Sequence, residues 1–275
     1  MKRILIIAAA AFSLIFGAGA GQAEDLCAGE RPCELDGGQY YIHLPDGAAA
    51  DAPKGAIFFL HGHRGSALKE IRKDGFKKLA DDLNVAFVAV QGVEGTWSFP
   101  TAPRNLRDEF AFFDQVLDDV AARFGVDRGR TMLSGFSSGG FMTWYLACEN
   151  AGRFSGYAPI AGAFWKPLPA SCETDTPFLF HIHGTKDTVV PLEGRPLGGG
   201  RWHQGDVFDS FKVWQRQVEK SRAAIETYTD AGFQCERWTP ATGLLELCLH
   251  DGGHSIRAEW LKRAWQELAK ARGWG

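Results

Sequence analysis

The chain has 275 residues and a formal net charge of −3, and 45% of its residues are hydrophobic. The small net charge gives no basic footprint, so we expect no nucleic acid partner. A mature chain of about 250 residues is long enough for one domain with a large buried core.

The first residues have the pattern of a cleavable secretory signal. A basic start at residues 1–3 is followed by an apolar run over residues 4–17 and by small residues that end at Ala23. We therefore expect cleavage of residues 1–23, a secreted or periplasmic protein, and one domain over residues 24–275. The alternative is a membrane anchor, but the apolar run is near the minimum length for a span and lacks a stop-transfer flank, so we expect no stable anchor. The residues before Cys27 do not form a lipidation box.

Strand and helix patterns alternate along the rest of the chain. Apolar runs predict strands at residues 39–44, 56–60, 85–90, 157–160, 178–182, 233–239 and 244–250. Helical patterns occur at residues 66–83, 105–124, 141–149, 206–220 and 255–272, with Ser66 and Asn105 as expected caps of the first two. The second helix carries an apolar stripe of Leu106, Phe110, Phe113, Leu117, Val120 and Phe124. The alternation predicts an α/β fold with a mostly parallel central sheet flanked by helices, and residues 193–205 are expected to be a surface loop.

A serine stands between a predicted strand and a predicted helix. An apolar run from Thr131 leads into Gly-Phe-Ser-Ser-Gly at residues 135–139, and a helical run follows directly. A serine hydroxyl becomes a useful nucleophile when it is held clear of the sheet, near a base, in a turn that glycine neighbours permit. This strand–turn–helix pattern resembles the nucleophile elbow of an α/β-hydrolase, which makes Ser137 the candidate nucleophile.

An aspartate and a histidine follow in the order that such an enzyme needs. Asp187 lies in a Gly-containing loop after the strand at 178–182, and His254 lies in a similar loop after the strand at 244–250. We expect His254 to take the Ser137 proton and return it to the leaving group, and Asp187 to orient the imidazole.

Each of these two assignments has a simpler alternative. Asp187 could be a turn or helix-capping aspartate, and His254 could be an ordinary loop histidine. Asp251 is the rival acid, but a residue three positions before the histidine is badly placed to reach its far ring nitrogen.

The negative charge that develops on an ester oxygen needs backbone N–H donors. One donor is expected to be the amide of Ser138, at the start of the helix that follows the serine. The other is expected in the loop at residues 61–65, with His63 as the preferred donor and Arg64 as the second choice.

Four histidines form two His-x-His pairs that resemble metal ligands. His61 and His63 follow one predicted strand, and His181 and His183 lie on another. In a fold of this type two further strands separate them, which places the pairs about 14 Å apart, too far for one zinc ion. We expect no metal and no other cofactor.

Six cysteines in an exported chain favour disulfides. A hairpin that pairs Thr239 with Leu244 sets Arg237 opposite Glu246 and sets two cysteines opposite each other on the same face. A second pair closes a small loop near the start of the mature chain, and the third follows by elimination. The expected disulfides are Cys235–Cys248, Cys27–Cys33 and Cys148–Cys172.

Several motifs together resemble one family, the polyhydroxybutyrate depolymerases and feruloyl esterases among the α/β-hydrolases. The matching motifs lie at residues 59–62, 129–140, 146–148, 183–191 and 252–255, within a region of about residues 54–268. The resemblance implies Ser137 as nucleophile, Asp187 as acid and His254 as base. The chain departs from the family at residues 256–258, Ile-Arg-Ala where Trp-Pro-Gly is frequent, and at His63, where tyrosine or cysteine is common.

The expected activity is hydrolysis of carboxylic esters by a serine esterase. The stretch between Ala161 and Phe178 is too short for a cap domain, so the site should be open, with Trp97 and Trp165 as its expected walls and Phe99 and Trp202 as further candidates. Any of these aromatics could instead be ordinary core or surface residues. Without a tail module for solid polymer, we expect feruloyl or acetyl sugar esters, or short hydroxyalkanoate esters, as substrates. A serine peptidase of the prolyl-oligopeptidase type and a non-catalytic binding protein are the alternatives, and the sequence gives no oligomeric state.

Overall fold

The computed structural model describes residues 27–46, 53, 55–172, 174–220 and 224–274. The expected secretory signal at residues 1–23 lies outside the described residues. None of the helices in the described part of the chain is long and apolar enough to span a bilayer.

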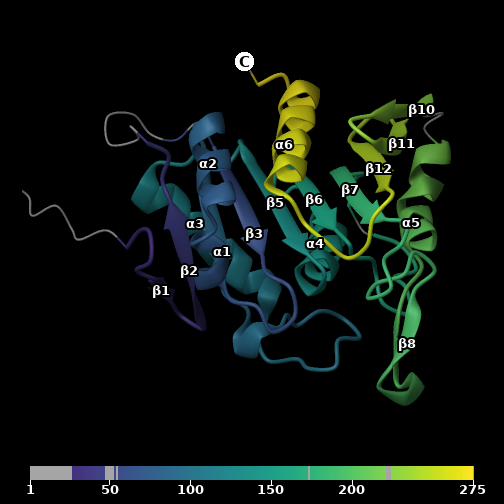
Figure 1. The fold of residues 1–275 in the computed structure, drawn as a ribbon, viewed down its shortest axis with the longest axis horizontal. Helices are drawn as coiled ribbons and strands as arrows, with labels where there is room; N and C mark the ends of the chain where they lie inside the picture. Colours follow the sequence, from purple (N-terminus) through teal and green to yellow (C-terminus); the bar gives the residue numbers. More distant parts are fainter. Residues whose placement is uncertain (1–26, 47–52, 54, 173, 221–223, 275) are drawn as a thin grey trace, which may run out of the picture.

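The centre of the molecule is a ten-stranded sheet in the order β1-β2-β4-β3-β5-β6-β7-β12-β11-β10 (Figure 1). The six strands from β4 to β12 are mutually parallel, and antiparallel strands flank them on both sides. The strands are β1 (Cys33–Leu35), β2 (Gly38–His43), β3 (Ala56–Leu60), β4 (Ala86–Val90), β5 (Thr131–Phe136), β6 (Gly156–Ile160), β7 (Phe178–Gly184), β10 (Ala224–Asp230), β11 (Phe233–Thr239) and β12 (Leu244–His250).

Helices cover both faces of this sheet. One face carries α3 (Glu109–Phe124), α4 (Ser138–Glu149) and α5 (Val207–Lys220), and the other carries α1 (Ala67–Ile71), α2 (Asp74–Leu83) and α6 (Ala258–Arg272). A separate hydrophobic core lies on each face of the sheet. Along β3, Phe58 and Leu60 belong to the core on the face of α3, α4 and α5, and Ile57 and Phe59 belong to the core on the opposite face. A strand buried on both faces is apolar at every position, which is why β3 reads as a solid apolar run. The predicted α/β class with a mostly parallel sheet is confirmed.

The helix predicted at residues 66–83 is wrong in extent, because the structure divides it into α1 and α2. Ser66 caps α1 through its side chain, and Lys73, with φ −71° and ψ 114°, interrupts the helix before α2 begins. The buried residues of α1 and α2 include Ile71 and Phe76, five positions apart. At about 100° per residue, a continuous helix would point these two side chains to different sides. The break lets both helices pack against the same face of the sheet.

The predicted cap at Asn105 is also wrong. The cap of α3 is Asp108, whose side chain accepts a hydrogen bond from the amide of Ala111. Leu106 lies before the helix and is 42% exposed, because its amide donates to Ser98 Oγ at 2.8 Å and is held in a loop. The rest of the predicted stripe lies on α3, mostly buried, and the helix also buries Phe112 and Val116.

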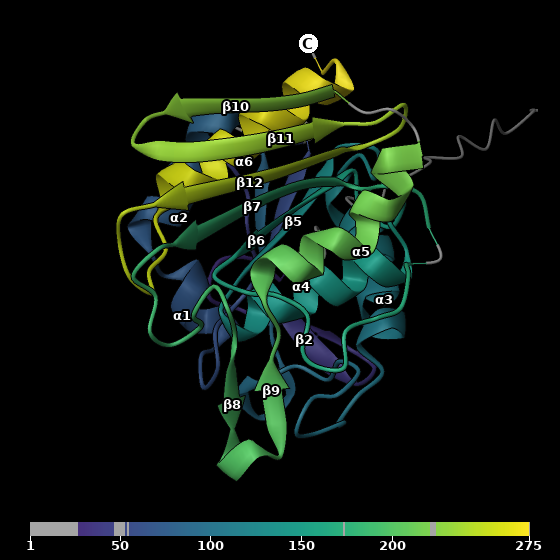
Figure 2. The same ribbon diagram turned by 90° about the vertical axis from the view of Figure 1, so that its right-hand side faces the viewer.

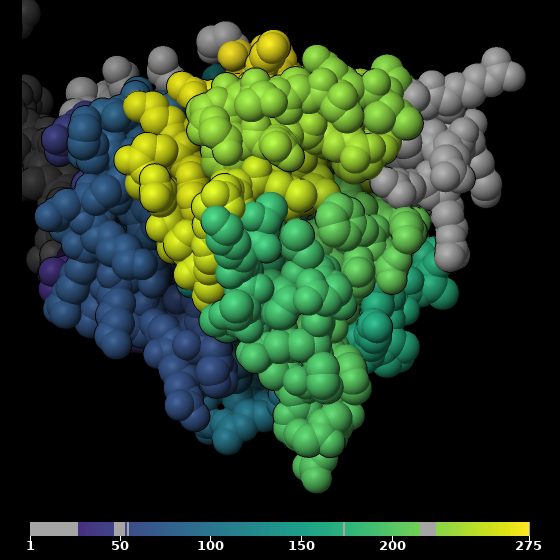
Figure 3. All heavy atoms as spheres, turned by 45° about the vertical axis from the view of Figure 1, so that its right-hand side comes forward, coloured from purple at the N-terminus to yellow at the C-terminus, as the bar shows by residue number. Residues whose placement is uncertain are grey.

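The stretch at residues 193–205 is a hairpin rather than a loop without regular structure. Strands β8 (Arg195–Leu197) and β9 (Trp202–Gln204) pair across a short 3₁₀ turn, η2 (Gly198–Gly200). A second 3₁₀ turn, η1 (Val93–Gly95), follows β4. The hairpin projects away from the central sheet (Figures 2 and 3). Its root is bonded to the segment between β6 and β7, since the amide of Lys166 donates to the carbonyl of His203 at 2.9 Å.

The six cysteines form the disulfides Cys27–Cys33, Cys148–Cys172 and Cys235–Cys248. The third crosslinks β11 and β12, in a register that also sets Arg237 opposite Glu246. These are the pairs and the register that the sequence argument gives.

Candidate active site

Ser137 occupies a sharp turn between β5 and α4. Its backbone has φ 56° and ψ −114°, a region that residues with a side chain rarely adopt and that marks functional sites. The turn is possible because glycines stand two positions before and two positions after the serine. A Cβ at Gly139 would lie 2.2 Å from the carbonyl oxygen of Leu60, and one at Gly135 would lie 2.3 Å from that of Gly139. The tight packing holds the Ser137 side chain at the carboxyl edge of the parallel strands.

Asp187 and His254 meet at the same edge of the sheet. Asp187 Oδ2 lies 2.7 Å from His254 Nδ1, and its Oδ1 accepts hydrogen bonds from the amides of Val189 and Val190, each at 2.8 Å. Burial opposes ionisation of this carboxyl, but these three hydrogen bonds outweigh it and hold the pKa of Asp187 below its ordinary value. An ionised carboxylate fixes the Nδ1–H tautomer of His254, which leaves Nε2 with a free electron pair.

Within the described residues, no hydrogen bond joins Ser137 to His254. The imidazole does lie against the residue before the serine, with its ring centre 4.5 Å from that of Phe136. Catalytic hydrogen bonds are often long in ligand-free enzymes and shorten when substrate binds.

The rival carboxylate, Asp251, is engaged elsewhere. It forms an ion pair with Lys186 at 2.6 Å, and its side chain is 79% exposed. An exposed ion pair of this kind contributes little, and Asp251 makes no contact with His254 among the described interactions.

The loop after β3 lies beside Ser137. A Cβ on Gly62 would be 3.6 Å from the Cβ of Ser137, so the next residue, His63, is close to the serine. The amide of Arg64 is already used, since it donates to the carbonyl of Gly95 at 2.8 Å. The hydrogen bonds of the described residues include none from the amide of His63, which leaves it open to a ligand.

His61 holds this loop in place, a role that the sequence analysis missed. It is fully buried; its Nδ1 donates to the carbonyl of Gly62 at 2.9 Å, and its Nε2 accepts from the amide of Gly92 at 3.0 Å. Burial lowers the pKa of His61, so the neutral ring that both hydrogen bonds require is the stable form. Its carbonyl oxygen accepts the indole N–H of Trp97 at 2.9 Å.

The histidines of the two His-x-His pairs do not gather around a common point. His181 and His183 lie on β7, and β5 and β6 separate that strand from β3. His181 Nε2 lies 3.0 Å from His183 Nδ1, and His183 Nε2 donates to the carbonyl of Val190 at 2.7 Å. In the described part of the chain, the one group with metal-like spacing is Cys235, Glu246 and Cys248, whose cysteines are joined in a disulfide.

A cavity of about 650 Å³ opens at Ser137 and Ser138. The four aromatic residues named from the sequence line it together with Phe141: Trp97, Phe99, Trp165 and Trp202. Trp97 and Trp165 are only 1% and 6% exposed, so they form its floor and inner wall. The outer wall is the β8–β9 hairpin, which the sequence analysis missed because its strands are only three residues long.

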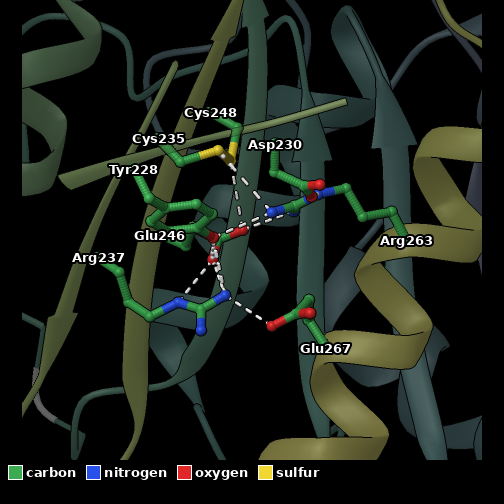
Figure 4. The surroundings of a disulfide bond; sticks show 8 residues. All are labelled: Tyr228, Asp230, Cys235, Arg237, Glu246, Cys248, Arg263 and Glu267. Carbon is green, nitrogen blue, oxygen red and sulfur yellow. Dashed lines mark hydrogen bonds and ion pairs between the residues drawn. A yellow bond between two sulfur atoms is a disulfide. The ribbon is translucent and has the colours of Figure 1, made fainter. Parts of the chain in front are cut away.

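The strand that leads to His254 is fixed by a buried ionic cluster around a disulfide (Figure 4). Glu246 on β12 is fully buried. Its carboxylate accepts hydrogen bonds from Arg237 on β11, at 2.7 Å, from Arg263 on α6, at 2.7 Å, and from Tyr228 on β10, at 2.6 Å. The Cys235–Cys248 disulfide lies next to this carboxylate, with Cys248 Sγ 3.3 Å from Glu246 Oε1. The cluster ties three strands and a helix together just before the His254 loop.

Comparison with known proteins indicates the class of this chain. The family model described as phospholipase/carboxylesterase matches residues 104–197. Feruloyl esterase C of Emericella nidulans is 28% identical over 199 residues, which are 69% of this chain and 70% of that protein. A putative esterase, NocK, of Nocardia uniformis is 33% identical over 162 residues, which are 56% of this chain and 46% of that protein.

Two solved structures show the same fold. An acetyl xylan esterase from Aspergillus awamori superposes with a TM-score of 0.58 at 15% identity, covering 84% of this chain and 94% of that one. The poly(3-hydroxybutyrate) depolymerase LpqC from Bordetella parapertussis has a TM-score of 0.54 at 13% identity, covering 87% and 88%.

The fold and the family match define the class: this protein is a serine carboxylic-ester hydrolase of the α/β-hydrolase fold. Within that class, the sequence is similar to feruloyl esterases, and the fold is that of the acetyl xylan esterase and the poly(3-hydroxybutyrate) depolymerase.

Proposed function

We propose that this protein is an exported esterase that cleaves carboxylic esters through an acyl-enzyme on Ser137. The observation that carries the proposal is the 2.7 Å contact between Asp187 and His254, at the edge of the sheet where Ser137 takes its strained turn. A carboxylate, an imidazole and a serine from three separate loops serve together in the acyl transfer reactions of this fold.

The first half of the reaction forms the acyl-enzyme. Ser137 Oγ attacks the ester carbonyl carbon while His254 Nε2 takes the hydroxyl proton. The amides of His63 and Ser138 stabilise the negative oxygen of the tetrahedral intermediate. As the intermediate collapses, the bond to the alcohol breaks, and His254 gives its proton to the departing oxygen.

The second half releases the acid. His254 takes a proton from a water molecule, whose oxygen attacks the acyl carbon. The bond to Ser137 Oγ then breaks, and the proton returns to the serine. Asp187 stabilises the imidazolium in both halves without accepting its proton.

We infer that the substrates are feruloyl or acetyl esters of sugars, or short hydroxyalkanoate esters. The relatives support this range, because their names include a feruloyl esterase and an acetyl xylan esterase. The aromatic cavity lining offers stacking surfaces for a phenolic acyl group or a sugar ring.

Export is supported by the three disulfides, since disulfides persist in oxidising compartments. Cleavage after Ala23 is tested by N-terminal sequencing of the protein recovered from the culture medium or periplasm.

A substrate panel tests the proposal directly. It consists of feruloyl, acetyl and hydroxybutyrate esters, simple aryl esters and peptide amides, with a fluorophosphonate probe applied in parallel. We expect ester turnover and labelling of Ser137. Preference for peptide amides would instead indicate a serine peptidase, and the absence of both labelling and turnover would indicate a binding protein on a hydrolase scaffold.

A further inference from the structure

The walls of the cavity carry an excess of positive charge, although the whole chain is negative, with a net charge of −3. Three arginines and one glutamate line it: Arg64, Arg104, Arg195 and Glu94. Glu94 and Arg104 form an ion pair with each other. Two guanidinium groups therefore face the substrate space without a carboxylate partner among the described residues.

Arg195 is the better placed of the two. It lies on β8, in the hairpin wall of the cavity, and is half-buried. Its Nε donates to the side-chain oxygen of Gln204 at 3.3 Å, and Gln204, on the paired strand, is only 5% exposed. A guanidinium has five N–H donors, and this contact uses one of them. The remaining donors form a planar fork that suits a carboxylate.

The position of Arg195 is fixed by the backbone around it. The backbone of Gln204 forms an isolated antiparallel β-bridge with that of Trp165, which lines the inner wall of the cavity. The amide of Gly205 donates to the carbonyl of Phe164 at 2.8 Å. The charged wall and the aromatic wall are therefore one connected unit, and less side-chain freedom is lost when a ligand binds to a group that is already held.

Arg64 lines the same cavity from the loop after β3, next to His63. Its backbone has φ 59° and is fixed by the hydrogen bond from its amide to Gly95. Its side chain is exposed and has no ionic partner in the described part of the chain.

We propose that this cavity selects esters that carry a carboxylate, with Arg195 as the main binding group and Arg64 as the second. The inference rests on the proposed esterase function and names the substrate class within it. The carboxylate belongs either to the acyl part, as in a half-ester of a dicarboxylic acid, or to the alcohol part, as in an ester of a hydroxy acid. A half-buried cation is screened less by salt and water than an exposed one, so it discriminates by charge more strongly.

Two matched pairs of substrates test this proposal and distinguish the two sources of charge. In the first pair, the 4-nitrophenyl half-ester of glutaric acid is compared with 4-nitrophenyl butyrate. In the second, 4-acetoxybenzoate is compared with its methyl ester. We expect kcat/KM to favour the anionic member in one pair by about tenfold through KM, as a charged hydrogen bond allows. In 1 M salt this preference should fall only in part, because the half-buried Arg195 is screened less than an exposed cation.

Substitutions then identify the arginine that binds the carboxylate of the substrate. Arg195→Gln should lower the anionic-to-neutral ratio of kcat/KM about tenfold, and Arg195→Lys should restore part of it because the charge remains. Arg64→Gln should lower the ratio less. The matched control is Arg201→Gln, which removes the same charge from the same hairpin. Arg201 packs on the Trp202 ring and does not line the cavity. This variant should leave the anionic-to-neutral ratio of kcat/KM unchanged.

Binding to the Ser137→Ala protein separates this inference from the proposed function. Calorimetry should give a Kd for the anionic ester about tenfold below that of its neutral partner, and Arg195→Gln in the same background should remove the difference. Equal affinity for both members of both pairs, or a ratio unaffected by Arg195→Gln, would overturn the inference even if the enzyme is an active esterase. A preserved charge preference without turnover or probe labelling would overturn the proposed function instead.

Discussion

At the scale of single residues, backbone contacts decide what the polar side chains can do. Asp187 is held by two amides on one oxygen and by His254 on the other, so it can neither rotate nor readily accept a proton. His61, a member of a His-x-His pair, holds the loop beside the serine in place through two hydrogen bonds. The same residue type therefore has different roles according to which backbone groups surround it.

Ser137→Ala should reduce ester hydrolysis by about 10⁶-fold and abolish fluorophosphonate labelling, because the nucleophile is lost. Circular dichroism and thermal melting should show an intact fold. The control is Ser134→Ala, which removes a hydroxyl that donates to the carbonyl of Ala158 in the core. This control should lower stability slightly and leave labelling intact, and labelling that persists in Ser137→Ala would move the nucleophile to another serine.

Asp187→Asn should lower kcat by about 10⁴-fold with little change in KM, because an amide favours the wrong tautomer of His254. Steady-state kinetics on an aryl ester provides the measurement. Asp251→Asn is the matched control, since that carboxylate pairs with Lys186 at the surface, and it should leave kcat within about twofold. A loss of only a few fold in Asp187→Asn would identify Asp187 as a structural turn residue.

At the scale of elements, the base-bearing loop depends on the β11–β12 hairpin. His254 follows the disulfide cysteine of β12 by six residues, and the ionic cluster around Glu246 joins that strand to α6. Removing one partner of a fully buried charge leaves the other uncompensated and is strongly destabilising. The hairpin therefore fixes the strand from which the His254 loop extends.

Replacing Cys235 and Cys248 with serine should lower the free energy of unfolding by about 3 kcal/mol, as expected for a closed loop of about 14 residues. Activity at low temperature should be retained, and it should fall near the lowered melting temperature without a change in substrate preference. Chemical denaturation and activity assays over a temperature series measure both effects.

The matched control for this variant is the double serine variant of Cys27 and Cys33, a pair six positions apart at the far end of the sheet. It should not shift the temperature at which activity is lost to the same extent. Peptide mapping of the non-reduced protein that joins Cys235 to another cysteine would contradict the pairing.

At the scale of the whole molecule, three buried histidines make stability depend on pH. Burial lowers the pKa of His61, His181 and His183 from the ordinary value of 6.5. Below about pH 6.5 the unfolded chain therefore binds more protons than the folded protein, and stability falls as pH falls. Asp187, whose pKa is lowered from 3.8, stabilises the fold above that pH, and its contribution is lost only as pH falls further through the folded value.

The free energy of unfolding should therefore decrease between pH 6.5 and 4.5, by about 1.4 kcal/mol per pH unit for each histidine that is protonated only in the unfolded chain. Urea denaturation at pH 7.5, 6.5, 5.5 and 4.5 measures this slope. His181→Gln should make the slope shallower whatever its effect on stability at pH 7.5. A slope of zero over this range would show that the buried histidines take up protons without unfolding.

Much of the fold and of the candidate site could be predicted from the sequence because the signals are local. A strand buried on both faces must be apolar throughout, and a sharp turn between strand and helix must have glycines where backbone approaches backbone, as at Gly135 and Gly139. The order of the serine, the aspartate and the histidine can likewise be read directly from the sequence. The helix cap was ambiguous in the sequence. Asp108 rather than Asn105 caps α3, because Ser98 holds the residues before Asp108 in a loop.

Tertiary structure alone decided the properties that depend on residues distant in sequence. The short strands of the β8–β9 hairpin have no periodicity to detect, and they pair because bonds to residues 164–166 hold their root. The amide of Arg64 is unavailable because it donates to the carbonyl of Gly95, a residue about thirty positions away, and this leaves His63 as the candidate donor. The charge of the cavity depends on which arginine finds a carboxylate, and only the fold pairs Arg104 with Glu94 and leaves Arg195 facing the substrate space. The sequence by itself thus determined the class of chemistry, whereas the shape and charge of the cavity arise from long-range contacts that no local pattern encodes.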